Sequence, residues 1–493
     1  MKYKLKFPEN TYKEILSLLR FKNEQAGFIL AGWMKRSGSI TLLAKKLLLC
    51  SSDGLRGNSP GHVEIKKDFA KRVLTVCKAK KLCLIHFHTH PFSSKGTRFS
   101  CIDDSCDEKF FSYVAEKIPG IYHAALVVGQ KHLDGRIYER NLATSLPVSE
   151  ISVIGDKLEK IIPNSSRKVT KMRGCESTIF QRQIRFLGKV GQRRLRSLSC
   201  AIVGLGGTGS LIFEGLLRLG VGKLILIDSD RIEVSNLNRI IQAFWEDVNS
   251  KRFKVDIMKR KAGKINPKTK IIALPRSLLT KSAQSLLKGV DVIFGTVDND
   301  LARLVLNQLA AKYLIPLVDV ATGINVDKKG KIVDFAGQVY VFIPGKSPCL
   351  SCLEAIDLKE VNLSLMSGED RIRQRQLGYI SGENIVAPAV LPLNMQLVSL
   401  ALAEFMNLVF GFRKLNNYVF YDGLSQDRVA YTIKVKSESS CPICSPEGLL
   451  AKGDLARFED LFRIRASKNI PTTRTSISKR EITNNNNKGG TNG

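Results

Sequence analysis

The stretch "CAIVGLGGTGS", residues 200–210, restricts the fold of this 493-residue chain more than any other feature. It runs from an apolar strand into a helix through Gly204-x-Gly206-x-x-Gly209, with Gly207 inside the pattern. Because glycines lack Cβ atoms, backbone amides at the start of the helix can approach a phosphate group. The stretch therefore predicts a strand, a phosphate-binding turn and a helix, which together indicate a nucleotide-binding site.

The segments that follow this turn repeat the same alternation. Apolar runs with the character of strands alternate with helical segments, and they include "LSCAIVGLG", "KLILIDSD", "TKIIALP", "DVIFGTVD" and "IPLVDVA". This alternation is typical of a mostly parallel sheet with helices on both faces. We predict a doubly wound, Rossmann-like α/β domain over residues 173–450.

The N-terminal part has a different pattern. An amphipathic helix in "TYKEILSLLRF" is followed by the strand-like runs "AGFILAGW", "KLCLIHFH" and "YHAALVVG", which predict a separate α+β domain over residues 1–150. Residues 151–172 lose this periodicity around Pro163 and are expected to be a linker. Residues 451–493 end in a polar, low-complexity stretch and are expected to form a largely disordered tail.

Charge and hydropathy limit the partners. The formal net charge is +32, but the basic residues are spread along the chain instead of forming one patch, so nucleic-acid binding is not favoured. We expect no membrane segment, because the sequence has no run of about 18 apolar residues that could span a bilayer. The N-terminus does not resemble a signal peptide, so a cytoplasmic location is expected.

Eleven cysteines, an odd number, favour metal or thiol chemistry over a disulfide framework.

Three of the six histidines lie within five residues, in "HFHTH" at positions 86–90. In a strand, residues two apart share a face, so His88 and His90 can bind one metal ion. Asp103 can supply a third ligand, which leaves a fourth position open for water. Zinc lowers the pKa of bound water to about 7, and a nearby carboxylate must then transfer the proton. Glu24 is the candidate.

Three motifs in this part, "EQAGFILAG" at 24–32, "HTHP", and Ser100-x-x-Asp103, resemble the JAMM (JAB/MPN) zinc isopeptidases. That family cleaves bonds after the C-terminal glycine of ubiquitin-like proteins. The resemblance implies that Glu24 is the general base and that His88, His90 and Asp103 bind zinc. It also implies that Ser100 stabilises the tetrahedral oxyanion. His86 is expected to support or pack against the site.

Polar residues follow the glycine-rich turn at the ends of later strands. Asp228 ends the next strand, where an acidic residue binds ribose hydroxyls. Asn236, Arg239 and Lys254 follow in "DSDRIEVSNLNR" and "KRFKVDIMKRKAGKINP", and Asp298 lies in "GTVDND". A nicotinamide site has no use for two cations here. In nucleotidyl transfer, by contrast, cations neutralise the departing pyrophosphate and a carboxylate holds Mg²⁺.

The stretch from "IFQRQIRFLGKVGQRRL" to "CPIC" resembles the ThiF/MoeB and ubiquitin-activating family of adenylyltransferases. The resemblance implies ATP and Mg²⁺ as cofactors, and a homodimer in which Arg182 acts as an arginine finger across the interface. It assigns ribose to Asp228, the phosphates to Asn236, Arg239 and Lys254, and Mg²⁺ to Asp298.

Four of the cysteines form two pairs, Cys349-x-x-Cys352 and Cys441-x-x-Cys444. This spacing is that of a structural tetrathiolate zinc site, which would join two distant segments. The other cysteines, apart from Cys175, which we leave unassigned, are expected to be core or solvated residues; they are Cys50, Cys77, Cys83, Cys101, Cys106 and Cys200.

No cysteine lies between Cys352 and Cys441, where many relatives carry the thiol that accepts the activated carboxyl. We expect the acyl-adenylate to pass to a thiol of a separate carrier or conjugating protein, or to an amine or sulfide. The alternative is that a cysteine elsewhere, such as Cys175, reaches the site.

Both halves can act on the same chain end. We expect the N-terminal domain to process or remove a ubiquitin-like or sulfur-carrier protein that ends in glycine, and the second domain to adenylate the exposed carboxylate. One alternative is adenylation of a sulfur carrier or peptide in thiamine, molybdopterin or peptide-antibiotic chemistry. The other is a non-catalytic binder of ubiquitin-like tails.

Overall fold

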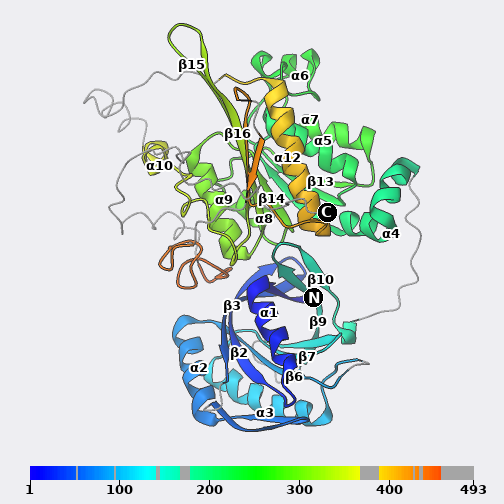
Figure 1. The fold of residues 1–493 in the computed structure, drawn as a ribbon, viewed down its shortest axis with the longest axis vertical. Coiled ribbons are helices and arrows are strands. Elements are labelled where there is room, and N and C mark those ends of the chain that lie inside the picture. The colour runs from blue at the N-terminus through cyan, green and yellow to red at the C-terminus, as the bar shows by residue number, and fades with distance from the viewer. Residues whose placement is uncertain are drawn as a thin grey trace, which may run out of the picture.

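Two eight-stranded sheets organise the protein, and they lie one beyond the other along its longest axis (Figure 1). The structure is a computed structural model. It describes residues 1–50, 54–93, 96–139, 145–166, 178–366, 388–425, 428–431 and 437–456. Cys175 and most of the expected tail lie outside these residues.

The N-terminal unit is built on a sheet with the strand order β1-β3-β2-β6-β7-β8-β9-β10. Because β9 also pairs with β1, the sheet closes on itself. The strands are β1 (Lys2–Pro8), β2 (Ala26–Arg36), β3 (Ser39–Leu49), β6 (Cys83–His90), β7 (His123–Gly129), β8 (Leu133–Tyr138), β9 (Ser145–Ile154) and β10 (Glu159–Ile161). A separate hairpin joins β4 (Leu55–Ser59) to β5 (His62–Ile65).

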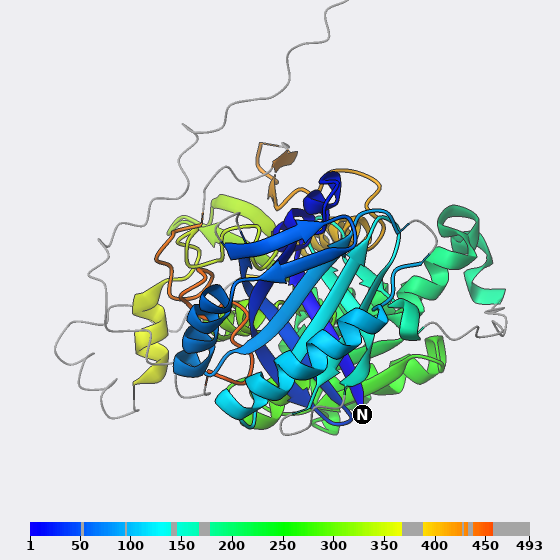
Figure 2. The same cartoon turned by 90° about the horizontal axis from the view of Figure 1, so that it is seen from below.

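Both faces of this sheet are covered, which explains why β2 has a continuous apolar run instead of an alternating one. Phe28 and Leu30 pack in one cluster with residues of α2 (Lys67–Lys80) and α3 (Cys101–Lys117). Ile29 and Ala31 pack in another cluster that includes Ile15 of α1 (Glu9–Ser17), which continues into the short helix η1 (Leu18–Arg20). Figure 2, seen from below, shows α2 and α3 in front of the sheet.

The second unit has the strand order β13-β12-β11-β14-β15-β16-β17-β18. The first five strands run parallel and the last three antiparallel. They are β11 (Ser199–Val203), β12 (Lys223–Ile227), β13 (Lys270–Leu274), β14 (Val292–Gly295), β15 (Leu317–Val326), β16 (Ile332–Phe342), β17 (Tyr418–Asp422) and β18 (Arg428–Tyr431). The predicted doubly wound, mostly parallel sheet is confirmed.

Helices cover both faces of this second sheet (Figure 1). Helices α5 and α7 lie on one face and α8 and α9 on the other, as a doubly wound sheet requires. The described helices of this unit are α4 (Gln181–Ser197), α5 (Gly207–Leu219), α6 (Trp245–Asn249), α7 (Lys254–Ile265), α8 (Lys281–Leu287), α9 (Asp300–Tyr313), α10 (Leu358–Leu365) and α12 (Leu391–Phe410), with the short helices η4 (Thr178–Phe180) and η5 (Val234–Asn236). A further short helix, η3 (Asn164–Ser166), packs on β8 and β9 of the N-terminal unit.

Among the described residues, helix α12 is long and apolar enough to cross a membrane by length and composition alone. The expectation that no such run exists was therefore wrong. More than half of its most apolar window is buried inside the protein, where it packs on α5, β15 and β16. This is the environment of a core helix.

Two segments depart from the expected boundaries. Strand β9 continues to Ile154, and β10 pairs with it, so the sheet of the N-terminal unit extends into the segment expected to be a linker. Residues 451–456, expected to begin the tail, lie packed between the two units, and Ala451 is fully buried.

Candidate active sites and metal groups

The first candidate site lies where the end of β6 meets the start of α3. The Nε2 atoms of His88 and His90 are 3.1 Å apart. Asp103 Oδ1 lies 3.2 Å from His88 Nε2, and Asp103 Oδ2 lies 3.8 Å from His90 Nε2. One ligand atom of each of the three residues lies within 4.8 Å of the others. Two imidazoles and a carboxylate at these separations fit a zinc ion with an open fourth position.

Local structure explains how these three residues meet. His88 and His90 share one face of β6 because side chains alternate along a strand. Ser100 is the N-cap of α3: its hydroxyl accepts from the Asp103 amide, and its own amide donates to Asp103 Oδ2 at 2.6 Å. This reciprocal capping fixes the Asp103 carboxylate toward the histidines. The Ser-x-x-Asp spacing is thus also a helix-start signal.

Glu24 reaches this group from the residues that lead into β2. Its Oε1 lies 3.5 Å from His90 Nε2, and its amide donates to the carbonyl of Ser59 in β4. Burial, and then the nearby charge of Asp103, raise the pKa of Glu24 to about 7. A carboxyl group with such a pKa can exchange protons near neutral pH.

An ion-pair network behind the histidines was not expected from the sequence. His86 Nδ1 lies 3.4 Å from Asp107 Oδ1, and Arg136 of β8 donates to Asp107, Asp104 and the Asp103 carbonyl. Arg136 therefore ties β8 to the first turn of α3. The link joins residues about thirty positions apart, so no local pattern could indicate it.

The second candidate site begins at the glycine-rich turn between β11 and α5. Gly204 has a φ of +87°, and a Cβ there would lie 2.5 Å from the Thr296 carbonyl oxygen. A Cβ at Gly209 would lie 1.9 Å from the Gly204 carbonyl oxygen, whereas one at Gly206 would meet nothing within 4 Å. Gly204 and Gly209 thus allow the backbone to fold tightly, while Gly206 borders open space.

Asp228 and Arg239 lie against this turn. Asp228 Oδ2 accepts from the Leu205 amide at 2.6 Å, and burial raises the pKa of its carboxyl. A Cβ on Gly207 would lie 3.1 Å from the Arg239 side chain. The guanidinium of Arg239 donates to the Ser235 carbonyl at 2.6 Å. Asp228, directly after β12, and Arg239, in the segment after η5, therefore both lie beside the glycine turn at the carboxyl ends of the parallel strands.

Lys254 and Asn236 lie in the two segments that follow β12. Lys254, at the start of α7, is buried and its Nζ donates to Asp230 Oδ2 at 2.9 Å. Asp230 was not expected from the sequence. Asn236 is buried in η5, and its carbonyl accepts from the Arg239 amide. A triphosphate at this edge would compete with Asp230 for the ammonium group.

Asp298 and Arg182 are both exposed. Asp298 follows β14, the neighbour of β11, and the Asn299 amide group donates to it. Thr296, two residues earlier, donates to the Gly204 carbonyl at 2.7 Å and so joins this loop to the glycine turn. Arg182 lies in the first turn of α4, and no described contact links it to these residues.

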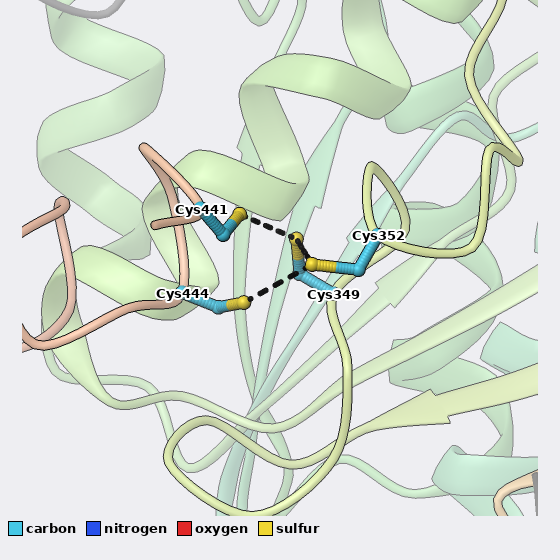
Figure 3. A group of neighbouring side chains, drawn as sticks. All are labelled: Cys349, Cys352, Cys441 and Cys444. Atoms are coloured by element: carbon cyan, nitrogen blue, oxygen red, sulfur yellow. Dashed lines mark hydrogen bonds between the residues drawn. The ribbon is translucent and has the colours of Figure 1, made fainter. Parts of the chain in front are cut away.

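The four paired cysteines form the third group (Figure 3). Their sulfurs lie 3.8 Å apart for Cys349–Cys352 and Cys349–Cys441, and 3.5 Å for Cys352–Cys444. A disulfide has sulfurs about 2 Å apart, whereas four thiolates around one zinc ion at 2.3 Å have sulfurs about 3.8 Å apart. The group therefore fits one tetrahedral ion held by residues 92 positions apart.

The remaining described cysteines do not join a metal group. Cys50, Cys77, Cys83 and Cys200 are buried. Cys101 and Cys106 are exposed on α3.

The doubly wound sheet with its glycine turn defines the second unit as a Rossmann-like α/β domain. The profile of the ThiF family matches residues 180–443, just over half of the chain. The chain therefore belongs to the ThiF family.

Similar proteins match between a third and just over half of the chain. Ubiquitin-like modifier-activating enzyme 5 of Oryza sativa subsp. japonica is 26% identical over 265 residues, 51% of this chain and 57% of that protein. Sulfur carrier protein adenylyltransferase of Thermus thermophilus is 33% identical over 172 residues, 34% of this chain and 59% of that protein. The chain thus spans less than two thirds of either relative. A crystal structure of E. coli MccB with ATP is 18% identical, with a TM-score of 0.42, over 55% of this chain and 75% of that one.

Proposed function

We propose that the ThiF-family domain uses ATP to adenylate the C-terminal carboxylate of a ubiquitin-like or sulfur-carrier protein. The observation that carries this proposal is the cluster at one edge of the sheet in a ThiF-family chain: the glycine turn with Asp228, Arg239 and Lys254 around it. The names of the relatives, an activating enzyme for a ubiquitin-like modifier and an adenylyltransferase for a sulfur carrier, support the class of substrate.

In the proposed reaction a carboxylate oxygen of the substrate attacks the α-phosphorus of ATP. The new P–O bond forms an acyl-adenylate, and the bond to the β-phosphate oxygen breaks to release pyrophosphate. Arg239 and Lys254 neutralise the charge that develops on this leaving group. Asp228 binds the ribose hydroxyls, and Asn236 contacts the phosphates. Asp298 is the carboxylate that would hold Mg²⁺, which would supply positive charge to the phosphates.

We further propose that the N-terminal unit is a zinc-dependent isopeptidase. His88, His90 and Asp103 would hold zinc, which when bound would polarise a carbonyl and acidify water. Glu24 takes a proton from the attacking water on its carboxylate and delivers it to the leaving amine. The proximity of Glu24 Oε1 to His90 Nε2, 3.5 Å, supports this role. Ser100 would donate its hydroxyl to the tetrahedral oxyanion.

A homodimer is part of the proposal, because Arg182 has no described contact with the ATP site of its own chain. Three exposed apolar residues, Ile179, Phe186 and Val190, lie in η4 and α4 on either side of Arg182 and are 62%, 71% and 72% exposed. A second copy that covers these residues would bring Arg182 to the partner's site. Sedimentation of the Phe186→Asp variant tests this, and an unchanged mass would contradict it.

The adenylation proposal is tested by ATP–pyrophosphate exchange with a small β-grasp protein that ends in glycine. Arg239→Ala is expected to lower exchange about 100-fold, the typical effect of losing one transition-state donor. Arg218→Ala, an exposed arginine of α5 paired with Glu214, is the matched control. Unchanged exchange in Asp298→Ala would show that the ATP site is wrongly assigned.

The alternatives give different results in the same assay. Exchange stimulated by a short peptide and not by the β-grasp protein would favour the hypothesis that the enzyme adenylates a peptide. Binding of the β-grasp tail without any exchange would favour the hypothesis that the protein is a non-catalytic binder.

A further inference from the structure

The segment directly after the second cysteine pair, residues 445–456, lies between the two units, and we call it the strap. Figure 1 shows it between the N-terminal sheet and the sheet of the ThiF-family domain. Leu449 and Leu450 are 4% and 5% exposed, and Ala451 is fully buried. Residues 451–456 of the strap were expected to begin a disordered tail, so the full burial of Ala451 was not expected.

The cysteine pair holds the start of the strap. The Leu449 amide donates to the Pro442 carbonyl at 3.0 Å, and the Gly448 amide donates to Ser445. A Cβ on Gly448 would lie 2.6 Å from the carbonyl oxygens of Cys441 and Pro442. The strap is therefore folded directly onto the loop that carries Cys441 and Cys444, and its starting position depends on where those two thiolates are held.

One edge of the strap binds the ThiF-family domain. The amides of Ala451 and Gly453 donate to the carbonyls of Ala311 and Lys312, at 3.0 and 2.9 Å, near the end of α9. Asp454 Oδ1 accepts from Tyr313 at 2.9 Å and from Lys288 at 2.5 Å.

The other edge binds the N-terminal unit. The Asp454 amide donates to the Trp33 carbonyl at 2.7 Å, and the Lys35 amide donates to Asp454 Oδ2 at 2.9 Å. Lys45 Nζ donates to the Leu450 carbonyl at 2.7 Å. A Cβ on Gly32 would lie 2.1 Å from the Ala451 carbonyl oxygen, so the strap needs a bare backbone at this position of β2.

The far side of the interface does not use the strap. There the Leu158 amide donates to the Leu408 carbonyl at 2.8 Å, and Lys160 pairs with Asp291 at 2.7 Å. Loss of the strap would leave these contacts in place, so the N-terminal unit would open along β2 and stay attached near β10.

We propose that the four-cysteine group is a metal-dependent lock between the two units: the thiolates fix the strap, and the strap holds β2 of the N-terminal unit against α9 of the ThiF-family domain. The single carboxylate of Asp454 joins both sides. Removal of the metal ion by a chelator would then change how the two proposed reaction centres are held together, with neither centre altered chemically.

Hydrogen–deuterium exchange on the full chain, read for individual amides, tests the lock, with cysteine-bound zinc measured by release with a mercurial. In Cys441→Ser, the amides of Lys35, Gly453 and Asp454 are expected to exchange at least ten times faster, while the Leu158 amide and the amides of β6 and β12 keep their protection. Unchanged exchange at the first three amides after the metal is lost would overturn the proposal, and so would general loss of protection.

A second variant disturbs the contact between the strap and β2 and leaves all four cysteines in place. Gly32→Val is expected to speed exchange at the same three amides while its cysteine-bound zinc stays at the wild-type level. Gly61→Val, at a position of the N-terminal unit where a Cβ would meet nothing within 4 Å, is the matched control. If exchange at these three amides were as slow in Gly32→Val as in the control, the strap would not hold the two units together.

Discussion

The two metal-type groups of this protein differ in almost every physical respect. The four cysteines are donors of one kind, three of them buried, and they come from two distant segments with no position left for another ligand. The group of His88, His90 and Asp103 mixes imidazole and carboxylate donors, would leave one position open on a tetrahedral ion, and has Glu24 beside it. Closed tetrathiolate sites serve structure and open sites serve catalysis. The comparison therefore predicts that the fold tolerates the loss of the group of His88, His90 and Asp103 and does not tolerate the loss of the four-cysteine group.

The largest effect is expected from Cys349→Ser. Cys349 is fully buried, and loss of a structural metal belongs to the few changes that cost more than about 4 kcal/mol. The variant should bind one zinc ion per chain fewer and unfold at a clearly lower temperature, measured by calorimetry with metal analysis.

The control for this variant is Cys106→Ser, which changes an exposed cysteine outside both metal groups. It should leave metal content and unfolding temperature unchanged. An equal loss of stability in His88→Ala would remove the distinction between a closed and an open group.

The next largest effect is expected from Glu24→Gln, which removes the proton acceptor and keeps the shape of the side chain. Hydrolysis of a fusion between a β-grasp protein and a C-terminal peptide should fall about 1000-fold, close to 4 kcal/mol of barrier. Zinc content and pyrophosphate exchange should stay at wild-type levels. Hydrolysis at the wild-type rate would show that Glu24 is not the base.

The sequence predicted the second unit well because its signals are local. The turn at Gly204–Gly209 and each alternating strand can be recognised within a short window of sequence, and together they indicate a doubly wound sheet. The histidines of β6 were also readable, because a period of two places His88 and His90 on one face. The end of the strap, residues 451–456, was predicted to be tail, because its contacts are not local: Asp454 contacts Trp33 and Lys35, more than 400 positions away. The contact between Arg136 and Asp107 could not be predicted either, because these residues are also not neighbours in the sequence.

A smaller effect should follow when the support of the open group is weakened and its ligands are kept. Arg136→Met removes the partly buried guanidinium that donates to Asp107 and to the Asp103 carbonyl. Loss of such supporting contacts typically weakens metal binding about 10-fold to 100-fold. Zinc competition titrations should show this at the open group alone. Arg56→Met, which changes an exposed arginine paired with Glu64, is the control.

The smallest effect on stability is expected from Ser100→Gly, which separates the two roles of this residue. As the N-cap of α3, Ser100 stabilises the helix start, but glycine at an N-cap costs only a few tenths of a kcal/mol. The hydroxyl is lost completely. If Ser100 also donates to the oxyanion, hydrolysis should fall about 100-fold, a typical value for one such donor, while the unfolding temperature hardly changes. If both stay near wild type, Ser100 only caps the helix and orients Asp103, and the open group then stabilises its oxyanion through other donors.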